Sequence, residues 1–326
     1  MAQLTTTFAG LILDNPIIIS SCGLTSNVEK IRELEAAGAG AVVLKSVFEE
    51  QISMQAGSMN GYGSPEADDY LGAYVRSHAL NEHIRLIEET KKVCHIPVIA
   101  SINCCTDSEW EDFAVLMQQA GADALELNIL SLQTSKDYVP GSFEQRHIDI
   151  LSHLKKKISI PVIMKLGTNF TNPIALINQL YANGAAAVVL FNRFYQPDIN
   201  IDNLSFTSTN VLSSPTELAD RLRWTAIASA EVGKMDYAIS GGVHSGDDVV
   251  KAVLSGAAAV EVCSILYQQG PKAIGAMKQA LSDWMDENCF DSIDLFKGRM
   301  NAKAAGDVNP FERTQFMRYF SSYSGE

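Results

Sequence analysis

Two neighbouring stretches, Tyr237-Ala-Ile-Ser-Gly-Gly-Val-His244 and Gly256-Ala-Ala-Ala-Val-Glu-Val-Cys-Ser264, decide the fold class of this chain. Each contains a short apolar run of the kind that forms a buried parallel strand. Each run ends in small or hydroxylated residues, where the backbone of Gly241 and Gly242 and the hydroxyl of Ser264 can approach an anion closely. Two such strand ends side by side are typical of the phosphate site of an eight-stranded βα barrel. A single Gly-Gly pair would indicate only a tight turn.

A recurring phrase supplies further strands. A glycine that would end a helix, then small residues, then an apolar strand occur four times, at residues 37–46, 120–128, 183–192 and 255–264. Four more apolar runs complete the set, at residues 16–20, 96–101, 160–165 and 237–240. Eight strands separated by helical patterns predict an α/β fold, the TIM (β/α)8 barrel, rather than an open sheet.

The whole chain, residues 1–326, is predicted to form one domain, in which the remaining segments pack around this barrel. Residues 4–8 and 11–13 predict a short N-terminal hairpin that caps the bottom of the barrel. A helix at 271–287 leads into a C-terminal helical extension. Two long connections, 47–79 and 193–215, follow strands and therefore lie over the face where such barrels carry functional loops.

Composition excludes several classes of protein. The 326 residues carry a net charge of −13, which argues against a nucleic-acid or anionic-membrane surface. Six cysteines without a CxxC pair, and the lack of a secretory leader or a membrane-length apolar run, predict reduced thiols in a cytoplasmic protein. The six histidines have no metal-ligand spacing, so no metal site is predicted.

Polar residues gather where the predicted strands end: Ser20, Ser21, Lys45, Ser46, Ser101, Asn103, Asn128, Lys165, Asn192, Gly241, Gly242, Cys263 and Ser264. A lysine inside a barrel is costly unless it is paired. Lys45 and Lys165 therefore either pair with carboxylates such as Glu126 or face a ligand that carries negative charge, and we favour the ligand. Glu126 alternates with apolar neighbours, which suits an ion pair with a lysine.

The order of these motifs resembles the dihydroorotate dehydrogenase family, in its soluble, FMN-dependent form. The phrases that carry the resemblance span the barrel: Leu44-Lys-Ser46, Glu126-Leu-Asn-Ile-Leu-Ser131, Met164-Lys-Leu166, Phe191-Asn192, Ser240-Gly-Gly-Val243 and Cys263-Ser264. The resemblance implies FMN as cofactor. Its ring would contact Ser20, Ser21, Lys45, Ser46, Asn128 and Lys165, and its phosphate Gly241, Gly242, Cys263 and Ser264. A cation at Lys165 would stabilise the reduced flavin.

The resemblance also implies catalytic and substrate-binding roles. Ser131 stands at the position of the family's catalytic base, with Lys45 and Lys165 beside the flavin. Asn128, Asn192 and Lys45 would hold the substrate. Arg193 is unusual for the family and is a candidate ligand for an extra carboxylate. The chain departs from the family at Leu132 and Gln133, where a proline and an asparagine are usual, and in the lid loop, where only Asn60 offers a partial match.

The leading hypothesis is an FMN-dependent oxidoreductase acting on a CH–CH group, which oxidises dihydroorotate to orotate in pyrimidine biosynthesis. One alternative is a related FMN enzyme for another cyclic amide or enone. Others are a flavin-binding protein without this activity and a flavin-free lyase that uses Lys45 or Lys165 as a Schiff base. The partner is predicted to be a small-molecule substrate, and a homodimer is expected by analogy with the soluble family members.

Overall fold

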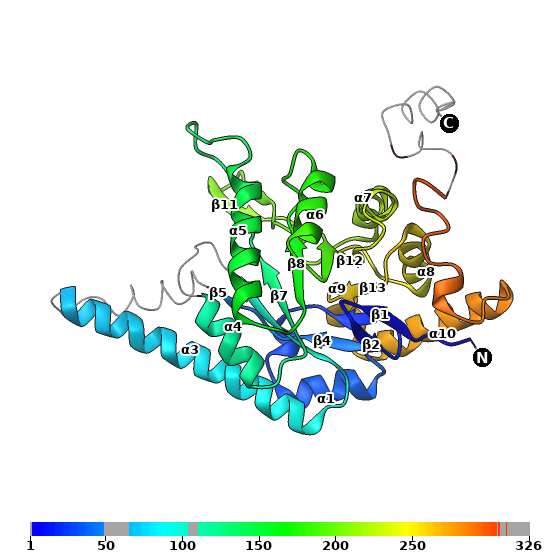
Figure 1. The fold of residues 1–326 in the computed structure, drawn as a ribbon, viewed down its shortest axis with the longest axis horizontal. Coiled ribbons are helices and arrows are strands. Elements are labelled where there is room, and N and C mark those ends of the chain that lie inside the picture. The colour runs from blue at the N-terminus through cyan, green and yellow to red at the C-terminus, as the bar shows by residue number, and fades with distance from the viewer. Residues whose placement is uncertain (1, 49–64, 104–109, 305, 307–310, 312–326) are drawn as a thin grey trace.

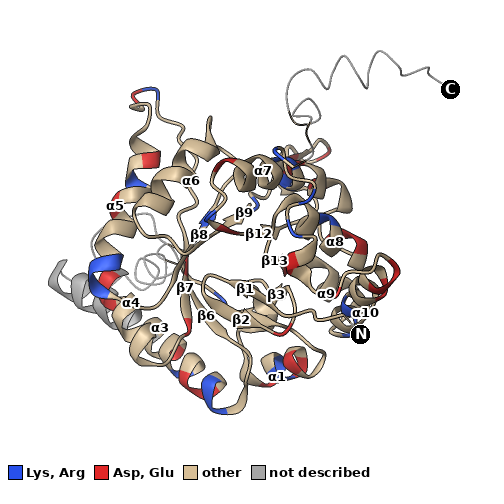
Figure 2. Ribbon diagram, turned by 45° about the vertical axis from the view of Figure 1, so that its right-hand side comes forward, with Lys and Arg blue, Asp and Glu red and all other residues tan. Residues whose placement is uncertain are grey.

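The computed structural model describes residues 2–48, 65–103, 110–304, 306 and 311 of the chain. Its centre is a closed barrel of eight parallel strands surrounded by helices (Figure 1, Figure 2). The strands are β3 (Ile17–Ile19), β4 (Ala41–Val43), β6 (Val98–Asn103), β7 (Ala124–Asn128), β8 (Val162–Leu166), β9 (Ala187–Leu190), β12 (Asp236–Ser240) and β13 (Ala259–Val262). Pairing of β13 with β3 and of β4 with β6 completes the ring. The predicted TIM barrel is confirmed.

Helices follow the strands and surround the barrel, and many of the charged residues belong to these helices (Figure 2). They are α1 (Val28–Ala36), α3 (Pro65–Val93), α4 (Trp110–Gln119), α5 (Ser142–Lys157), α6 (Pro173–Ala182), α7 (Leu218–Glu231), α8 (Gly246–Ser255), the short α9 (Ser264–Gln269) and α10 (Lys272–Glu287). Local signals set their ends. The Asn27 side chain caps α1, and Gly256, at φ +116°, ends α8 in the left-handed conformation that glycine adopts without strain.

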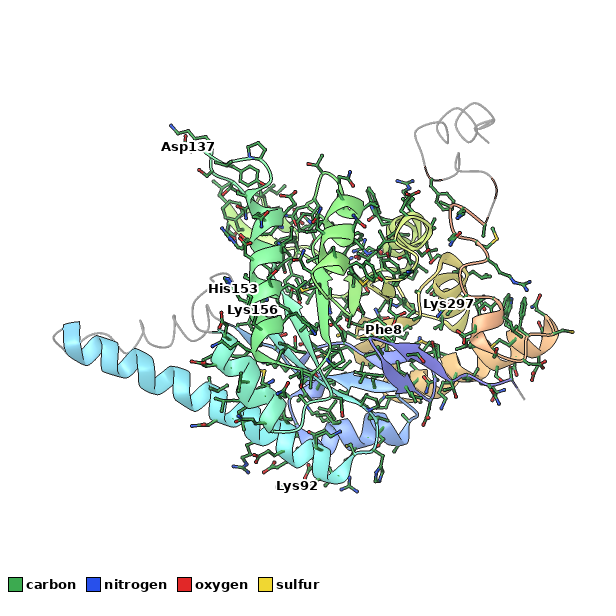
Figure 3. The ribbon with its side chains drawn as sticks, in the orientation of Figure 1. Phe8, Lys92, Asp137, His153, Lys156 and Lys297 are labelled. Atoms are coloured by element: carbon green, nitrogen blue, oxygen red, sulfur yellow. The ribbon has the colours of Figure 1, made fainter. Side chains whose placement is uncertain are left out.

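The N-terminal hairpin closes the bottom of the barrel. Strands β1 (Thr6–Phe8) and β2 (Leu11–Leu13) pair antiparallel, and Phe8 and Leu13 are fully buried. The Thr6 hydroxyl donates to the Ala258 carbonyl at 3.1 Å, and the Ala9 N–H donates to Asp236 at 2.9 Å. Figure 3 shows Phe8 directed inward, whereas labelled lysines such as Lys92 project from the surface. The predicted cap is confirmed.

Inside the barrel, small and aliphatic side chains pack against this hairpin: Ile18, Ala41, Val43, Ile99, Ala124, Ile163, Ala187, Val189, Ala238 and Ala259. Since strand side chains alternate between faces, the next inward position along each strand lies two residues further on. That position carries Ser20, Ser101, Glu126, Lys165 and Glu261, all of them buried. The barrel interior therefore changes from apolar to polar toward the C-terminal ends of the strands.

The two long connections differ from the expectation of plain loops. In the first, β5 (Val47–Phe48) adds to β6, and α3 already begins at Pro65. Proline is favoured in the first turn of a helix, and the acidic residues that follow it suit the positive end of the helix dipole. Asn60 lies outside the described residues. The second connection contains a hairpin of β10 (Pro197–Asn200) and β11 (Ser205–Ser208).

Three single-turn 3-10 helices complete the described structure: η1 (Gly23–Thr25), η2 (Pro215–Glu217) and η3 (Ile293–Leu295). The predicted helix at 271–287 is confirmed as α10, which packs on α8 and α9. Most of the expected extension beyond residue 304 lies outside the described residues. Within the described ranges, no helix has both the length and the apolar character needed to cross a membrane.

Candidate functional site

A cavity of about 680 Å³ opens at the C-terminal ends of the barrel strands, a size in the range of small-molecule sites. Many residues predicted from the sequence lie on its wall: Ser20, Ser21, Lys45, Ser46, Asn103, Asn128, Lys165, Asn192, Arg193, Gly241, Gly242, Cys263 and Ser264. They come from strands and loops distributed along the whole chain, and the closed barrel brings them together. Lys45 is exposed at the rim, whereas Lys165 is buried at the floor.

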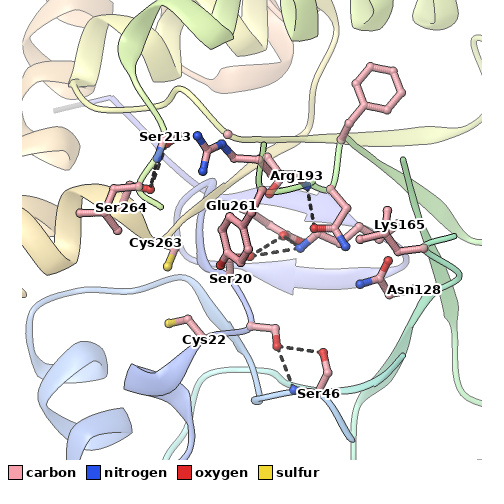
Figure 4. A pocket seen from close by; sticks show the side chains of 18 of the residues that line it. Ser20, Cys22, Ser46, Asn128, Lys165, Arg193, Ser213, Glu261, Cys263 and Ser264 are labelled. Atoms are coloured by element: carbon pink, nitrogen blue, oxygen red, sulfur yellow. Dashed lines mark hydrogen bonds and ion pairs between the residues drawn. The ribbon is translucent and has the colours of Figure 1, made fainter. Parts of the chain in front are cut away.

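Lys165 forms a buried ionic cluster with two glutamates (Figure 4). Its Nζ contacts a carboxylate oxygen of Glu261 directly and lies 3.5 Å from Oε1 of Glu126. The Ser20 hydroxyl accepts a hydrogen bond from Lys165 at 3.1 Å and donates one to Glu261 at 3.0 Å. Of the two alternatives that the sequence left open for Lys165, pairing with carboxylates is therefore the one observed, although the lysine also lines the cavity.

The cluster is close to neutral. Burial raises the pKa of Glu126 well above its usual range, the charge on Glu261 raises it further, and Lys165 opposes both effects. Burial also acts to raise the pKa of Glu261, but Lys165 and hydrogen bonds from Glu126 and Ser20 outweigh it and lower the pKa. The two carboxylates overcome burial to raise the pKa of Lys165. The stable state is therefore a lysinium, one glutamate anion and one protonated Glu126.

A chain of hydroxyl groups leads from this cluster to the first strand end. The Glu126 carboxylate accepts from the Ser101 hydroxyl at 3.5 Å, and Ser101 lies 2.7 Å from the Ser46 hydroxyl. Ser46 in turn contacts the Ser21 hydroxyl at 3.0 Å, and the Ser46 N–H donates to the same Ser21 oxygen. This chain orders one wall of the cavity, because each hydroxyl holds the next in place.

Two asparagine side chains on the wall carry buried oxygens that lack a hydrogen-bond partner among the described residues. These are Oδ1 of Asn103 and Oδ1 of Asn128, at the ends of β6 and β7. A buried amide without a partner costs about 1–3 kcal/mol, so native proteins rarely leave one unpaired. Both side chains line the same cavity as Lys165. The wall therefore suits a ligand that presents N–H donors to these two oxygens.

At the other end of the cavity, N–H and hydroxyl groups converge around Ser213. The Gly242 N–H donates to the Ser213 hydroxyl at 3.3 Å, and the Ser213 N–H donates to the Ser264 hydroxyl at 2.9 Å. His244 Nε2 lies 3.2 Å from the Ser213 hydroxyl. Gly242 has φ +82°, and a Cβ on it would lie 2.4 Å from the Leu218 nitrogen, so a side chain is excluded there. The donor set is of the kind that binds an anion.

Two predicted residues lie differently from the rest. The Arg193 guanidinium donates to the carbonyls of Asn210 and Val211, at 2.7 and 2.6 Å, and to Glu217 at 3.1 Å, so it ties down the loop that leads to Ser213. Ser131 is not among the described residues that line the cavity. Its hydroxyl accepts from the Gln133 side chain at 3.1 Å, on an exposed part of the loop after β7. The catalytic role of Ser131 stays a prediction.

The wall residues that sequence reasoning gave no role include Cys22, Ser213, Glu261 and Tyr267. Glu261 could have been found, because it is a lone polar residue in an apolar strand, as Glu126 is. Ser213 reaches the site through a long loop, and no local pattern marks it. Cys22 and Tyr267 lie far apart in the sequence, and only the fold brings them together.

Comparisons with known proteins agree with this geometry. The family model described as dihydroorotate dehydrogenase matches residues 3–285. Two relatives are named dihydroorotate dehydrogenase B (NAD(+)), catalytic subunit, and come from Thermoplasma volcanium and Thermoplasma acidophilum. Each is 30% identical to the chain, and the aligned region covers 91% of the chain and 98% and 99% of the two relatives, respectively. The NAD-dependent dihydropyrimidine dehydrogenase subunit PreA of Escherichia coli is 24% identical over 92% of the chain and 77% of its own length. The chain therefore belongs to the dihydroorotate dehydrogenase family of oxidoreductases.

Proposed function

We propose that this protein is an FMN-dependent oxidoreductase that removes two hydrogens from a CH–CH group in a cyclic amide, with dihydroorotate as the leading substrate. The observation that carries the proposal is the pair of buried Oδ1 oxygens of Asn103 and Asn128, which lack a hydrogen-bond partner and lie on the wall that Lys165 shares. A six-membered cyclic amide offers the N–H donors that these two oxygens lack.

Family membership implies a flavin, and the chain's residues fit FMN. The donors around Gly242, Ser213 and Ser264 would hold its phosphate, and Lys165, Ser46 and Ser21 would line its ring. A side chain at Gly242 would clash with the backbone of Glu217 and Leu218. Bound FMN would supply the acceptor for the hydride that leaves the substrate. Since Glu261 balances the charge of Lys165, the lysine would act on the flavin mainly as a hydrogen-bond donor.

The chain's own residues would orient the substrate and move its proton. Asn103, Asn128 and Asn192 would position the amide groups of the ring beside the flavin. Ser131 would take the proton from the carbon next to the carbonyl. A serine with an ordinary pKa needs a second group to pass that proton on. The loop that carries Ser131 would have to turn its hydroxyl toward the cavity when substrate binds.

A second candidate substrate is a dihydropyrimidine without a carboxylate. Arg193, which the sequence suggested as a carboxylate ligand, instead donates to two loop carbonyls and to Glu217. The relative named dihydropyrimidine dehydrogenase subunit is consistent with such a substrate. Both candidates share the same reacting CH–CH group, so the same cavity serves either one.

The test is the visible spectrum of the purified protein, followed by anaerobic addition of dihydroorotate or dihydrouracil. We expect a yellow protein that is bleached by one of the two compounds. Bleaching by dihydrouracil alone would select the second candidate. A colourless protein that binds no added FMN would overturn the proposal, and a bound flavin that neither compound reduces would leave a flavin-binding protein without this activity.

The base is tested by Ser131→Ala, with Ser135→Ala on the same exposed loop as the matched control. Loss of a general base slows proton transfer by about 10²–10⁴-fold, so we expect slow flavin reduction with flavin binding intact. Ser135→Ala should reduce at the normal rate. Equal rates in the two variants would exclude Ser131. The expected homodimer and cytoplasmic location stay predictions.

A further inference from the structure

Two cysteine side chains, Cys22 and Cys263, lie on the wall of the cavity, and the proposed reaction gives neither thiol a redox role. Cys22 follows β3 and Cys263 follows β13, and these strands pair in parallel with Ile19 opposite Val262. The Ser20 N–H continues the ladder by donating to the Val262 carbonyl at 3.0 Å. The two side chains come from adjacent strand ends and line the same cavity (Figure 4). Both thiols are free and half-buried.

The Cys22 sulfur is surrounded by hydrogen-bond donors. It accepts from the Cys263 thiol, from the backbone N–H groups of Leu24 and Thr25, and from the Tyr267 hydroxyl. Donors aimed at one sulfur stabilise the thiolate, which is the nucleophilic form of cysteine. The Cys263 thiol is the largest contributor, and together these donors lower the pKa of Cys22 to about 6 although burial acts against them.

Cys263 has the opposite character. Its proton is shared with the Cys22 sulfur, and this hydrogen bond, together with burial, raises the pKa of Cys263. The charges that face it are the Cys22 thiolate, Lys165 and Glu261; Lys165 favours the Cys263 thiolate, whereas Glu261 and Cys22 oppose it. The pair is therefore asymmetric, with one thiolate and one protonated thiol, as a two-step exchange of sulfur bonds requires.

The other described cysteines lack this environment. Cys94 is buried, and burial together with the nearby Glu35 raises its pKa to about 11. Cys289 is exposed and follows the end of α10. Among the described cysteines, only Cys22 and Cys263 combine contact with each other, a set of donors and access to a cavity.

We propose that Cys22 and Cys263 form a redox-active dithiol that exchanges with small-molecule disulfides in the cavity. The Cys22 thiolate would attack one sulfur of the disulfide, form a mixed disulfide and release one thiolate. Cys263 would then lose its proton and attack the Cys22 sulfur, which closes an intramolecular disulfide and releases the second thiolate. Two protein thiols are oxidised and one disulfide is reduced to two thiols. The reverse reaction with a small thiol restores the pair.

This inference does not rest on the proposed function, because the exchange needs neither flavin nor turnover. The dithiol lies in the same cavity as the proposed flavin site, because Cys22 and Cys263 both line that cavity. Closing the disulfide would join the ends of the first and last barrel strands across the cavity mouth.

The test uses full-length protein as purified, in a Cys104→Ser, Cys105→Ser, Cys289→Ser background, with 5,5′-dithiobis(2-nitrobenzoate) as the disulfide. We expect two coloured thiolates released per chain, no retained adduct, and a peptide in which Cys22 and Cys263 are cross-linked. Adding Cys263→Ser should release one thiolate and retain one adduct on Cys22. Adding Cys22→Ser should slow the release about tenfold at pH 7, because an ordinary thiol is mostly protonated there and its higher nucleophilicity offsets only part of the loss.

Peptide mapping of the protein with only the three background substitutions shows whether Cys22 and Cys263 form a disulfide. This result holds even if a variant with a further substitution fails to fold. Two separate adducts on Cys22 and Cys263 would overturn the proposal, and so would a Cys22→Ser variant that reacts as fast as the background. Neither result bears on whether the protein binds FMN or oxidises dihydroorotate, so failure of one proposal is distinguishable from failure of the other.

Discussion

The two ends of the barrel interior differ although the same eight strands build both. At the N-terminal end, inward positions carry residues such as Ile18, Ile99 and Ala124, which pack against Phe8 of the hairpin. Two residues further along the same strands, the inward positions carry Ser20, Ser101 and Glu126. A shift of two residues along a strand thus leads from the apolar core to the polar floor of the cavity.

The two ends of the barrel interior therefore have different roles, one in stability and one in binding and chemistry. At the bottom end the inward positions are apolar, and this end gains stability from burial and packing. The top end buries three ionisable groups, Lys165, Glu126 and Glu261, which are tolerable only because they compensate one another. We therefore expect changes at the bottom to alter stability alone, and changes at the top to alter both stability and flavin chemistry.

The largest effect is expected from Lys165→Met. Removing the ammonium leaves the Glu126–Glu261 pair without its cation, which costs about 3–5 kcal/mol when a buried pair is broken. The free energy of unfolding, measured in urea, should fall by this amount, and flavin reduction should slow.

The matched control is the double variant Lys165→Met, Glu261→Gln, which removes the stranded anion and should recover much of the lost stability. A loss below about 1 kcal/mol in Lys165→Met would contradict the ionic cluster, since one removed partner should strand a buried charge.

At the opposite end, Phe8→Ala should cost about 3–5 kcal/mol through the lost burial and the cavity left behind. Ile12→Ala on the same hairpin is the control: Ile12 is 72% exposed, so its change should stay within about 0.5 kcal/mol. Folded Phe8→Ala protein should still reduce its flavin at the normal rate in stopped-flow measurements. A slower rate would show that the two ends are coupled.

Glu126→Gln should change the pH dependence of stability. Because the folded-state pKa of Glu126 is raised above its usual 4.5, its contribution is complete at pH values below 4.5 and is lost as the pH rises. Above that point the unfolded chain ionises first, so the wild-type protein loses about 1.4 kcal/mol per pH unit until the folded pKa is passed. Glutamine cannot titrate. The stability difference between variant and wild type should therefore grow in favour of the variant with rising pH, and a constant difference between pH 5 and 8 would refute a protonated Glu126.

The smallest effect is expected from Arg193→Ala, which removes the ties to the loop before Ser213. A charge-assisted hydrogen bond contributes about 1.5 kcal/mol, so KM should rise about tenfold. If Arg193 holds the loop, the rise should be the same with dihydroorotate and with dihydrouracil. A rise confined to dihydroorotate would instead make Arg193 a ligand of the substrate carboxylate, as the sequence suggested.

Much of the fold could be predicted, because its signals are local. The recurring glycine, small-residue and apolar-strand phrase marks strands such as Ala124–Asn128, and the polar residue that ends each strand marks the cavity. Helix α3 shows the limit: the composition of residues 47–79 predicts a loop through Pro65, although this proline and the acidic residues after it favour the start of a helix. The hairpin β10–β11 was hidden in the same way.

The barrel, its capped bottom and the set of polar residues at the strand ends can be predicted from local patterns, because strand period, helix caps and turn glycines act within a few residues. The contacts that those polar residues make are visible in the folded structure alone. Glu261 neutralises Lys165, Ser213 reaches Gly242, and Cys22 meets Cys263 because closure of the barrel joins the first strand to the last. Such contacts depend on long-range strand pairing, which no local pattern encodes.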